Sequence, residues 1–543
     1  MRLPGARLIV EFLKETGVRH IFGLSGHSLF PITDALYAEP AIRYVPVMHE
    51  LCGAYMAVAY ARATRRLGIC LASSGGGATN LVTGIAYAHK ESCPLIALAS
   101  DVSSDVAGKG ASSWHEVPQE QIFRPITKLS VTLKEGRVIE QLREAARLAT
   151  TGRKGPVYVG IPRDLQTAQV DLPALPQSIG VTEPTAPDMA AVEKAARELQ
   201  EASAPILIAG GGVYWAGAEE ELKGLAELLS IPFATTPSHK GLVSEDHPLA
   251  LGVLGFGAFP FANQISAESD LLLAVGATFS EGLTLGYGNK VIPAAARIIQ
   301  VDLDAREIGK SYPVHLPIVG DAKAVLRGLI EALKRRGTGK RNAARLERIA
   351  RAKDLWREKL LAHGYEPDDP INQWHLYRAL REATDEEAIV VGAGGTAELI
   401  RRFVARSYVY HSGEFRVIGH GLSTSIGLAL AVPSRPVVCV TGDGSFMLET
   451  QEMATAAALG LPIAIVVIRN GAYGNMKRDQ IKHYGGRVIG TDLYLPDFCA
   501  LASSYGVAAE RVERPPDLVP AIKRMLALKR PALLDVVCPI EGI

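Results

Sequence analysis

Asp443 and Asn470 each follow an apolar run of the kind that forms a buried strand. The run before Asp443 ends in Gly-Asp-Gly, and a stretch of strong helix formers that closes at Gly460 lies between the two residues. A strand–helix–strand unit can place its two strands side by side in a parallel sheet, so we expect both side chains at the same sheet edge. A carboxylate and an amide oxygen are hard ligands that suit Mg²⁺.

The residues after Asp443 favour an anion beside this ion. Gly444 and Ser445 lead into a helix, and the free N–H groups at a helix N-terminus attract anions such as a diphosphate. The spacing therefore predicts a metal–diphosphate site. A strand-end turn followed by an Asn cap, with no ligand, is the alternative that the residues alone leave open.

The same stretch resembles the thiamine-diphosphate signature of the superfamily that contains acetolactate synthase, pyruvate oxidase and benzaldehyde lyase, and the resemblance covers nearly the whole chain. It implies thiamine diphosphate and Mg²⁺ as cofactors. Arg469 departs from the signature, because the family has the first of two Asn residues there. The resemblance assigns the metal to Asp443, Asn470 and the backbone carbonyl of Ala472. It assigns cofactor contacts to Gly442, Gly444, Ser445, Tyr473 and Gly474.

Glu50 is the candidate for the carboxylate that this family places against N1′ of the cofactor's aminopyrimidine ring. It follows an apolar run and opens a helix rich in small residues, "ELCGAYMAVAYAR". On its own, a Glu at this position is typical of a favourable charge at a helix N-terminus. The "SSGGGATN" loop, with Ser73 and Asn80 at its ends, resembles the family's Gly-Pro-Gly loop beside the pyrimidine, although Gly76 stands where Pro is usual.

The family also bends its cofactor over one bulky apolar side chain. The segment "FRVIGHGLSTSIG" resembles the part of the family that supplies it, with Ile418 in that position. The resemblance then assigns the backbone carbonyl of Arg416 to the cofactor's 4′-amino group. An ordinary core residue at Ile418 is the alternative.

Several polar residues are candidates for the substrate pocket. His27 and His115 occupy positions at which family members carry pocket residues, and an imidazole suits proton transfer to carbonyl compounds. Each histidine can equally be a hydrogen-bonded structural residue. Asp479 stands where acetolactate synthases have a Trp that shapes the choice of acceptor. The other pocket candidates are His420, Asn475 and Gln480.

A flavin in the central part of the chain is doubtful. The flavin-contacting Arg-Phe-Asp-Asp-Arg stretch of acetolactate synthases is replaced by "ATFSEGLTLG" at residues 277–286. The "GGGV" run at residues 210–213 could hold FAD or another nucleotide, but a lone Gly-rich turn is weak evidence.

The elements that must position these residues alternate between short apolar runs, Gly-rich turns and helical patterns. Such alternation predicts an α/β fold with parallel sheets and ligands at the carboxyl ends of strands. The length of 543 residues suits three domains. We expect three doubly wound parallel-sheet domains: a pyrimidine-binding domain with the catalytic Glu at residues 1–180, a central domain at 181–360 and a diphosphate-binding domain at 361–543. Linkers are predicted at residues 171–188 and 334–370.

Composition excludes some classes of protein. The net charge of +1 removes the electrostatic argument for nucleic acid or an anionic membrane as the main partner. The six scattered cysteines are typical of reduced, mostly buried thiols. The N-terminus enters an amphipathic helical pattern without a signal peptide, and the longest uncharged run is broken by "SSGGG". We expect a cytoplasmic protein.

The resemblance implies an enzyme that makes or breaks a C–C bond next to a carbonyl, a carboligase or 2-oxo acid decarboxylase of the transferase or lyase class. Its partners would be a small carbonyl substrate and further copies of the chain. The resemblance implies a homodimer or homotetramer with sites across the subunit interface, because the N-terminal domain supplies Glu50 and the C-terminal domain supplies the metal site. The alternatives are a flavin-linked 2-oxo acid oxidase of the same fold and a catalytically silent binding or regulatory homologue.

Overall fold

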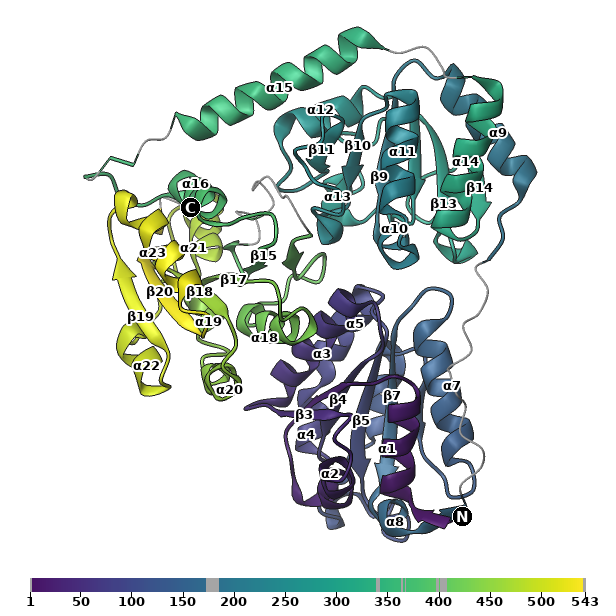
Figure 1. Cartoon of the computed structure of the whole chain (residues 1–543), viewed down its shortest axis with the longest axis vertical. Coiled ribbons are helices and arrows are strands. Elements are labelled where there is room, and N and C mark those ends of the chain that lie inside the picture. The colour runs from purple at the N-terminus through teal and green to yellow at the C-terminus, as the bar shows by residue number, and fades with distance from the viewer. Residues whose placement is uncertain are drawn as a thin grey trace. The chain divides into compact units, whose positions relative to one another are not determined.

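The computed structural model describes residues 2–171, 185–337, 342–362, 365–366, 368–396, 400 and 408–540. Within these residues the chain builds three six-stranded sheets, each with all its strands parallel and with helices packed on it (Figure 1). The predicted α/β class with three doubly wound parallel-sheet domains is confirmed. No helix of the described residues is long and apolar enough to cross a membrane.

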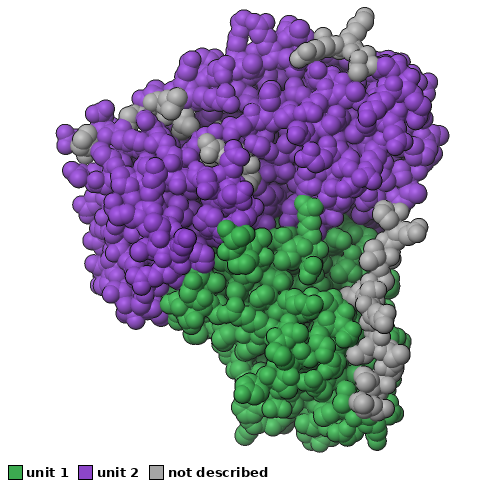
Figure 2. Space-filling view, in the orientation of Figure 1, with its two compact units in different colours: residues 1–182, 422–434, 449–461 green, residues 183–421, 435–448, 462–543 purple. Residues whose placement is uncertain are grey.

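The chain divides by its internal contacts into two compact units, which Figure 2 shows in different colours. Unit 1 comprises residues 1–182, 422–434 and 449–461, and unit 2 comprises residues 183–421, 435–448 and 462–543. Two segments from the last quarter of the chain therefore group with the N-terminal sheet.

The sheet of unit 1 has the strand order β3-β2-β4-β5-β7-β6. Strand β5 is almost wholly buried, as expected for a parallel strand covered on both faces. The strands are β2 (His20–Gly23), β3 (Arg43–Pro46), β4 (Gly68–Ala72), β5 (Leu95–Asp101), β6 (Ser130–Thr132) and β7 (Pro156–Pro162), and β1 (Arg2–Pro4) pairs antiparallel with β8 (Gln169–Asp171). The helices are α1 (Gly5–Glu15), α2 (Phe30–Tyr37), α3 (Glu50–Thr64), α4 (Gly76–Asn80), α5 (Val82–Lys90), α6 (Gln119–Phe123), α7 (Val138–Thr150) and α8 (Arg163–Thr167).

Helix α3 is buried on nearly every side, which explains why its sequence is rich in small residues. Helix α18 (Gly421–Ala431) approaches it so closely that a Cβ at Gly427 would lie 2.3 Å from the carbonyl oxygen of Met56. Only glycine permits two backbones to come this near. Helix α20 (Glu452–Leu459) is the other late helix of unit 1, and the predicted C-terminal Gly460 adopts the left-handed conformation that closes it.

Unit 2 contains the other two sheets. The central sheet has the order β11-β10-β9-β12-β13-β14, and the C-terminal sheet has the order β16-β15-β17-β18-β20-β19. The central strands are β9 (Pro205–Ala209), β10 (Phe233–Thr235), β11 (Ala250–Val253), β12 (Leu271–Val275), β13 (Arg297–Asp302) and β14 (Leu316–Val319). The C-terminal strands are β15 (Ile389–Ala393), β16 (Tyr410–His411), β17 (Val437–Gly442), β18 (Ile463–Arg469), β19 (Ala508–Val512) and β20 (Ala532–Val537).

The helices of unit 2 cover these two sheets. Around the central sheet lie α9 (Met189–Glu201), α10 (Gly211–Ala216), α11 (Glu219–Leu229), α12 (Pro260–Ala267), α13 (Glu281–Thr284) and α14 (Ala322–Arg336), followed by α15 (Ala343–Leu361). Around the C-terminal sheet lie α16 (Gln373–Ala383), α19 (Asp443–Phe446), α21 (Gly474–His483), α22 (Phe498–Ser504) and α23 (Leu518–Ala527).

The predicted domain edges near residues 180 and 360 remain a proposal. Residues 172–184 lie outside the described part of the chain. Helix α15 is tied to the central domain, because the Arg345 guanidinium donates to the Pro205 carbonyl at 2.7 Å and the Lys353 ammonium donates to the His247 carbonyl at 2.6 Å. These contacts favour an edge after α15.

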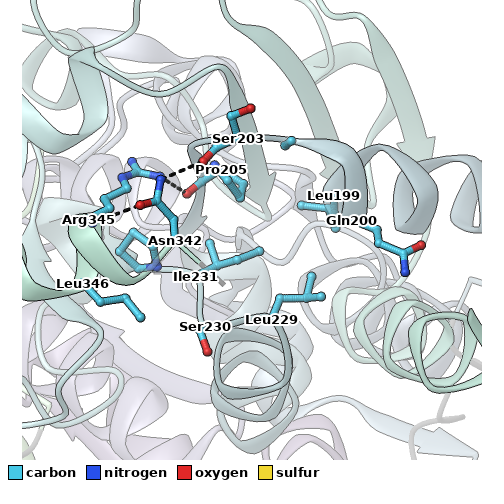
Figure 3. Close-up of a pocket in the computed structure, with 12 residues that line it drawn as sticks. Leu199, Gln200, Ser203, Pro205, Leu229, Ser230, Ile231, Asn342, Arg345 and Leu346 are labelled. Carbon is cyan, nitrogen blue, oxygen red and sulfur yellow. Dashed lines mark hydrogen bonds between the residues drawn. The ribbon is translucent and has the colours of Figure 1, made fainter. Parts of the chain in front are cut away.

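Each sheet has a point inside it from which the strands are added in opposite directions, between β2 and β4, between β9 and β12, and between β15 and β17. Open α/β sheets bind ligands at the carboxyl ends of the strands beside such a point. Figure 3 shows a pocket at the opposite edge of the central sheet, where Arg345 and Asn342 from the start of α15 face the residues that precede β9 and β10. It therefore lies away from the expected ligand edge.

Candidate active site

Asp443 and Asn470 lie side by side at the carboxyl edge of the C-terminal sheet. Strands β17 and β18 are parallel neighbours, with Gly442 opposite Ile468. The side chain of Asp443 is buried, and its Oδ2 accepts the backbone N–H groups of Asn470 at 2.8 Å and Gly471 at 2.7 Å. Burial raises the pKa of Asp443, while these backbone donors act in the opposite direction.

Asn470 and Ala472 lie on the turn that follows β18. The Oδ1 atom of Asn470 accepts the N–H of Ala472 at 3.1 Å, and Ala472 forms an antiparallel bridge with Asp492. A buried carboxylate directly after β17, with an amide oxygen and a backbone carbonyl on the turn after β18, is a hard donor set that suits Mg²⁺. The assignment of Asp443, Asn470 and Ala472 to a metal stays a prediction.

The two glycines that flank Asp443 have different surroundings. A Cβ at Gly442 would have no other atom within 4 Å, whereas a Cβ at Gly444 would lie 2.6 Å from the Tyr473 ring. Ser445 lies in α19, directly after this turn, and its Oγ accepts the N–H of Gly419 at 2.9 Å. The N–H of Gly444 donates to Asp443 Oδ1 at 2.7 Å, so an anion held beside this turn would draw on the N–H groups that follow Gly444 in α19.

Ile418 lies in the segment that Ser445 holds. It is 43% exposed, so the alternative of an ordinary core residue is wrong. Its Cγ2 would lie 3.8 Å from a Cβ at Gly394, in the turn after β15. Arg416 has a positive φ of 56°, and its guanidinium stacks 4.6 Å from the ring centre of Phe256.

The pocket candidates of the C-terminal domain have different surroundings. The Asn475 amide would lie 3.2 Å from a Cβ at Gly395, beside the turn after β15, and Gly474 lies against Asn470. Gln480 uses both ends of its amide on the backbone of Ile489, at 3.1 and 2.9 Å. Asp479 is exposed on α21, and His420 is fully buried before α18. Asn475 therefore lies next to the point between β15 and β17 at which the direction of strand addition changes.

Glu50, Ser73 and Asn80 come together in unit 1, at the carboxyl edge of its sheet. Glu50 is the first residue of α3 and is 6% exposed. The Asn80 amide donates to Glu50 Oε2 at 2.9 Å. A Cβ at Gly77 would lie 3.0 Å from Glu50 Oε1 and 2.6 Å from Ser73 Oγ. A favourable charge at the N-terminus of α3 is therefore not the whole account of Glu50, because Asn80 also binds its carboxylate.

Both predicted catalytic histidines border the loop that begins at Ser73. His27 opens a short 3-10 helix, and a Cβ at the preceding Gly26 would lie 2.8 Å from Ser73 Cβ. His115 has a positive φ of 65°, and its carbonyl oxygen would lie 2.6 Å from a Cβ at Gly75. Their proton-transfer roles stay predictions.

Sequence reasoning missed Gln119 and Glu452. The buried Gln119 accepts the N–H of Gly75 at 3.1 Å and donates to the Ser100 carbonyl at 3.2 Å, so it anchors the loop beside Glu50. Glu452 is fully buried and accepts the N–H groups of Met48 and His49. The available signal for Glu452 was an acidic residue within a helix of otherwise small and apolar residues.

In the Gly-rich turn of the central domain, two backbone N–H groups already donate hydrogen bonds to backbone carbonyls. Gly210 donates to the Val275 carbonyl at 3.1 Å and Gly212 donates to the Gly276 carbonyl at 3.0 Å. A Cβ at Gly212 would lie 2.5 Å from Gly276 Cα. These glycines serve close packing of β9 on β12, and two of the N–H groups that a nucleotide phosphate would need are already used.

Comparison with known proteins covers all three domains. Family models described as "Thiamine pyrophosphate enzyme" match residues 3–123 as the N-terminal TPP binding domain, 192–329 as the central domain and 392–536 as the C-terminal TPP binding domain. The probable acetolactate synthase large subunit of Methanocaldococcus jannaschii is 36% identical, with 100% of this chain and 93% of that protein covered. The acetolactate synthase large subunit of Corynebacterium glutamicum is 35% identical, with 98% and 86% covered. That of Haemophilus influenzae is 32% identical, with 97% and 93% covered. The chain belongs to the thiamine pyrophosphate enzyme family.

Proposed function

We propose that the protein is a thiamine-diphosphate- and Mg²⁺-dependent carboligase that joins two carbonyl compounds, with a 2-oxo acid as the donor. The observation that carries the proposal is the Asp443 turn, in which one carboxylate oxygen accepts the N–H groups of Asn470 and Gly471. Similarity along the whole chain to acetolactate synthase large subunits supports the same function.

The C-terminal domain would hold the metal and the diphosphate. Asp443, Asn470 and the Ala472 carbonyl would hold Mg²⁺, which would supply positive charge against the diphosphate. Gly444 would let the backbone come close to the same anion, and Ser445 would offer it an N–H group. The exposed Ile418 would support the middle of the cofactor, because an apolar side chain exposed beside a polar turn is free to pack on a ligand.

The N-terminal domain would move the proton that activates the cofactor. Bound thiamine diphosphate supplies a nucleophilic carbon and an electron sink for C–C bond chemistry beside a carbonyl. Glu50 would exchange a proton with N1′ of the aminopyrimidine ring, and Asn80 would keep its carboxylate in place. His27 and His115 would donate or accept protons at the substrate carbonyl.

The two alternative functions are not favoured. The relatives reported above carry the name of acetolactate synthase and not that of an oxidase or a regulatory protein. A transferase would pass the donor carbon unit to a second carbonyl compound, whereas a lyase would release it as an aldehyde. The exposed Asp479 in place of an acceptor-shaping Trp leaves the acceptor open.

We also propose that each active site draws on two copies of the chain, in a homodimer or homotetramer. Glu50 belongs to unit 1 and Asp443 to unit 2, yet one cofactor needs both. Closed twofold symmetry is the common arrangement for such assemblies.

Product analysis tests the proposed function. The enzyme would be supplied with thiamine diphosphate and Mg²⁺ and fed pyruvate, glyoxylate or an aromatic 2-oxo acid, with and without an aldehyde acceptor. A carboligase yields a hydroxyketone or hydroxy-oxo acid that Glu50→Gln does not form. Release of free aldehyde alone would point to a decarboxylase, and consumption of oxygen with a bound yellow chromophore would point to the oxidase. No product from any of these donors would contradict the proposal.

A further inference from the structure

Glu452 joins helix α20 to the turn that carries Glu50. Its side chain is fully buried, and its Oε1 accepts the N–H of Met48 at 2.9 Å and the N–H of His49 at 3.1 Å. Its Oε2 accepts the Thr455 hydroxyl at 2.7 Å. The Glu452 side chain therefore binds the two residues that precede Glu50, and Thr455 of the same helix orients it.

His49, the residue before Glu50, is fixed from both sides. Its N–H donates to Glu452, and its Nδ1 accepts the N–H of Leu51 at 3.1 Å, which makes it the N-cap of α3. Its backbone is extended, with a φ of −153° and a ψ of 137°. The direction in which Glu50 leaves the turn is therefore set by contacts of the residue before it.

The other end of Glu50 is held separately. Asn80 donates to Oε2 of Glu50 at 2.9 Å, and Gly77 leaves just enough room for Oε1. One oxygen of the buried Glu452 side chain accepts two backbone N–H groups, so Glu452 anchors both of them. Asn80 thus fixes the tip of the side chain and Glu452 fixes its base.

We propose that Glu452 is a positioning residue for Glu50. It sets the reach of the Glu50 carboxylate by holding the turn at Met48 and His49, and it does so without touching the cofactor. This inference rests on the proposed role of Glu50 in activating thiamine diphosphate.

Glu449 provides a matched control on the same segment. It is also fully buried, and it also accepts two backbone N–H groups with its carboxylate. Its partners are Leu422 and Ser423 at the start of α18, each at 2.9 Å, and not the turn before Glu50. Loss of either carboxylate removes a comparable set of buried contacts, but loss of Glu452 alone releases Met48 and His49.

The experiment compares Glu452→Asp with Glu449→Asp, since shortening by one methylene withdraws the carboxyl group and keeps its chemical type. Glu452→Gln is the conservative variant, because its amide oxygen still reaches the two N–H groups and its NH₂ reaches Thr455. Hydrogen exchange of the peptide that contains Met48 and His49 measures how well Glu452 protects their two N–H groups. This measurement does not depend on enzyme activity. The kcat, KM, thiamine-diphosphate affinity and Tm of each variant are measured alongside, together with the activity of Glu50→Gln.

For Glu452→Asp we expect exchange of the Met48 and His49 amides to accelerate about tenfold or more. We expect kcat to fall by about 10- to 100-fold with little change in KM or cofactor affinity, since a shift of about 1 Å in a reacting group costs up to about 10²-fold. Glu452→Gln should restore most of the rate. Glu449→Asp should lower Tm but leave the exchange and kcat within about twofold of the parent.

Unchanged exchange in Glu452→Asp, or losses of kcat that simply follow the loss of Tm in both Asp variants, would overturn the inference alone. Parent-like activity in Glu50→Gln would overturn the role of Glu50 and the inference with it. The two failures are therefore distinguishable.

Discussion

The side-chain amide of Asn80 donates a hydrogen bond of 2.9 Å to Oε2 of Glu50, at the carboxyl edge of the N-terminal sheet. Asn80 ends α4 and Glu50 begins α3, so two helix ends that are distant in sequence meet at one carboxylate. Gly77 and Ser73 lie on the other side of the same group. A carboxylate held in this way keeps one geometry, as the proposed proton exchange requires.

Glu50→Gln should preserve the fold and cofactor binding and remove most of the activity. The amide keeps the shape of the side chain but cannot exchange the proton, an effect of about 10²–10⁴-fold in general acid–base catalysis. The measurement is exchange of the cofactor's C2 proton by NMR, with calorimetry as the control for binding. Exchange at the parent rate would show that Glu50 is the wrong residue.

Gly77→Ala should impair the enzyme, and Gly76→Ala should not. An added Cβ at Gly77 would lie 3.0 Å from Glu50 Oε1 and 2.6 Å from Ser73 Oγ, whereas a Cβ at Gly76 would meet no atom within 4 Å. We expect Gly77→Ala to lower kcat by about tenfold or more, because it displaces the Glu50 carboxylate. Equal kcat for the two variants would contradict this arrangement of the loop.

Glu449 should make the free energy of unfolding depend on pH. Burial raises the pKa of this carboxyl from its ordinary value of 4.5 to about 7 in the folded protein. The folded state then binds the proton more tightly than the unfolded chain. The resulting stabilisation is complete below about pH 4.5 and is lost as the pH rises through about 7, with an amplitude of roughly 3 kcal/mol.

Glu449→Gln removes this titration. The difference in free energy of unfolding between the parent and Glu449→Gln should change between pH 4.5 and 7 and stay constant above it, as measured by urea denaturation at each pH. Comparison at pH 4.5 isolates the effect of the amide itself. A difference that is the same at every pH would show that Glu449 ionises normally.

Mixed assemblies test whether sites are shared between subunits. A Glu50→Gln chain and an Asp443→Ala chain, allowed to exchange subunits, should regain part of the activity, because a mixed dimer contains one site with both residues intact. Native mass spectrometry checks that exchange has occurred. If mixed dimers form and no activity returns, each chain builds its sites alone.

Much of the Asp443 region could be predicted from the sequence, because its contacts lie within one strand–helix–strand unit. Asp443 and Asn470 end two strands of one strand–helix–strand unit, and parallel pairing brings their ends together. Gly460 likewise closes α20 as its position suggests. The β-branched runs and the glycines that end them suffice for such inferences.

Glu452 could not be predicted, because the contacts that define its role span the chain. Met48 and Glu452 are separated by 404 positions in sequence, and nothing in the helix around Glu452 indicates which element covers it. Gln480 shows the converse, since resemblance places it in a substrate pocket while its amide is engaged with Ile489. Local periodicity assigns faces to helices and strands, but long-range packing decides which polar groups those faces enclose.

Calorimetric titration of Asp443→Ala with thiamine diphosphate and Mg²⁺ tests the central claim most directly. The parent should bind thiamine diphosphate only when Mg²⁺ is present. The variant should keep its fold by circular dichroism and bind more than about 100-fold more weakly, since the loss of a group that merely supports a metal ligand already costs about 10–100-fold. Unchanged affinity of Asp443→Ala at saturating Mg²⁺ would contradict the assignment of this turn to the metal and the diphosphate.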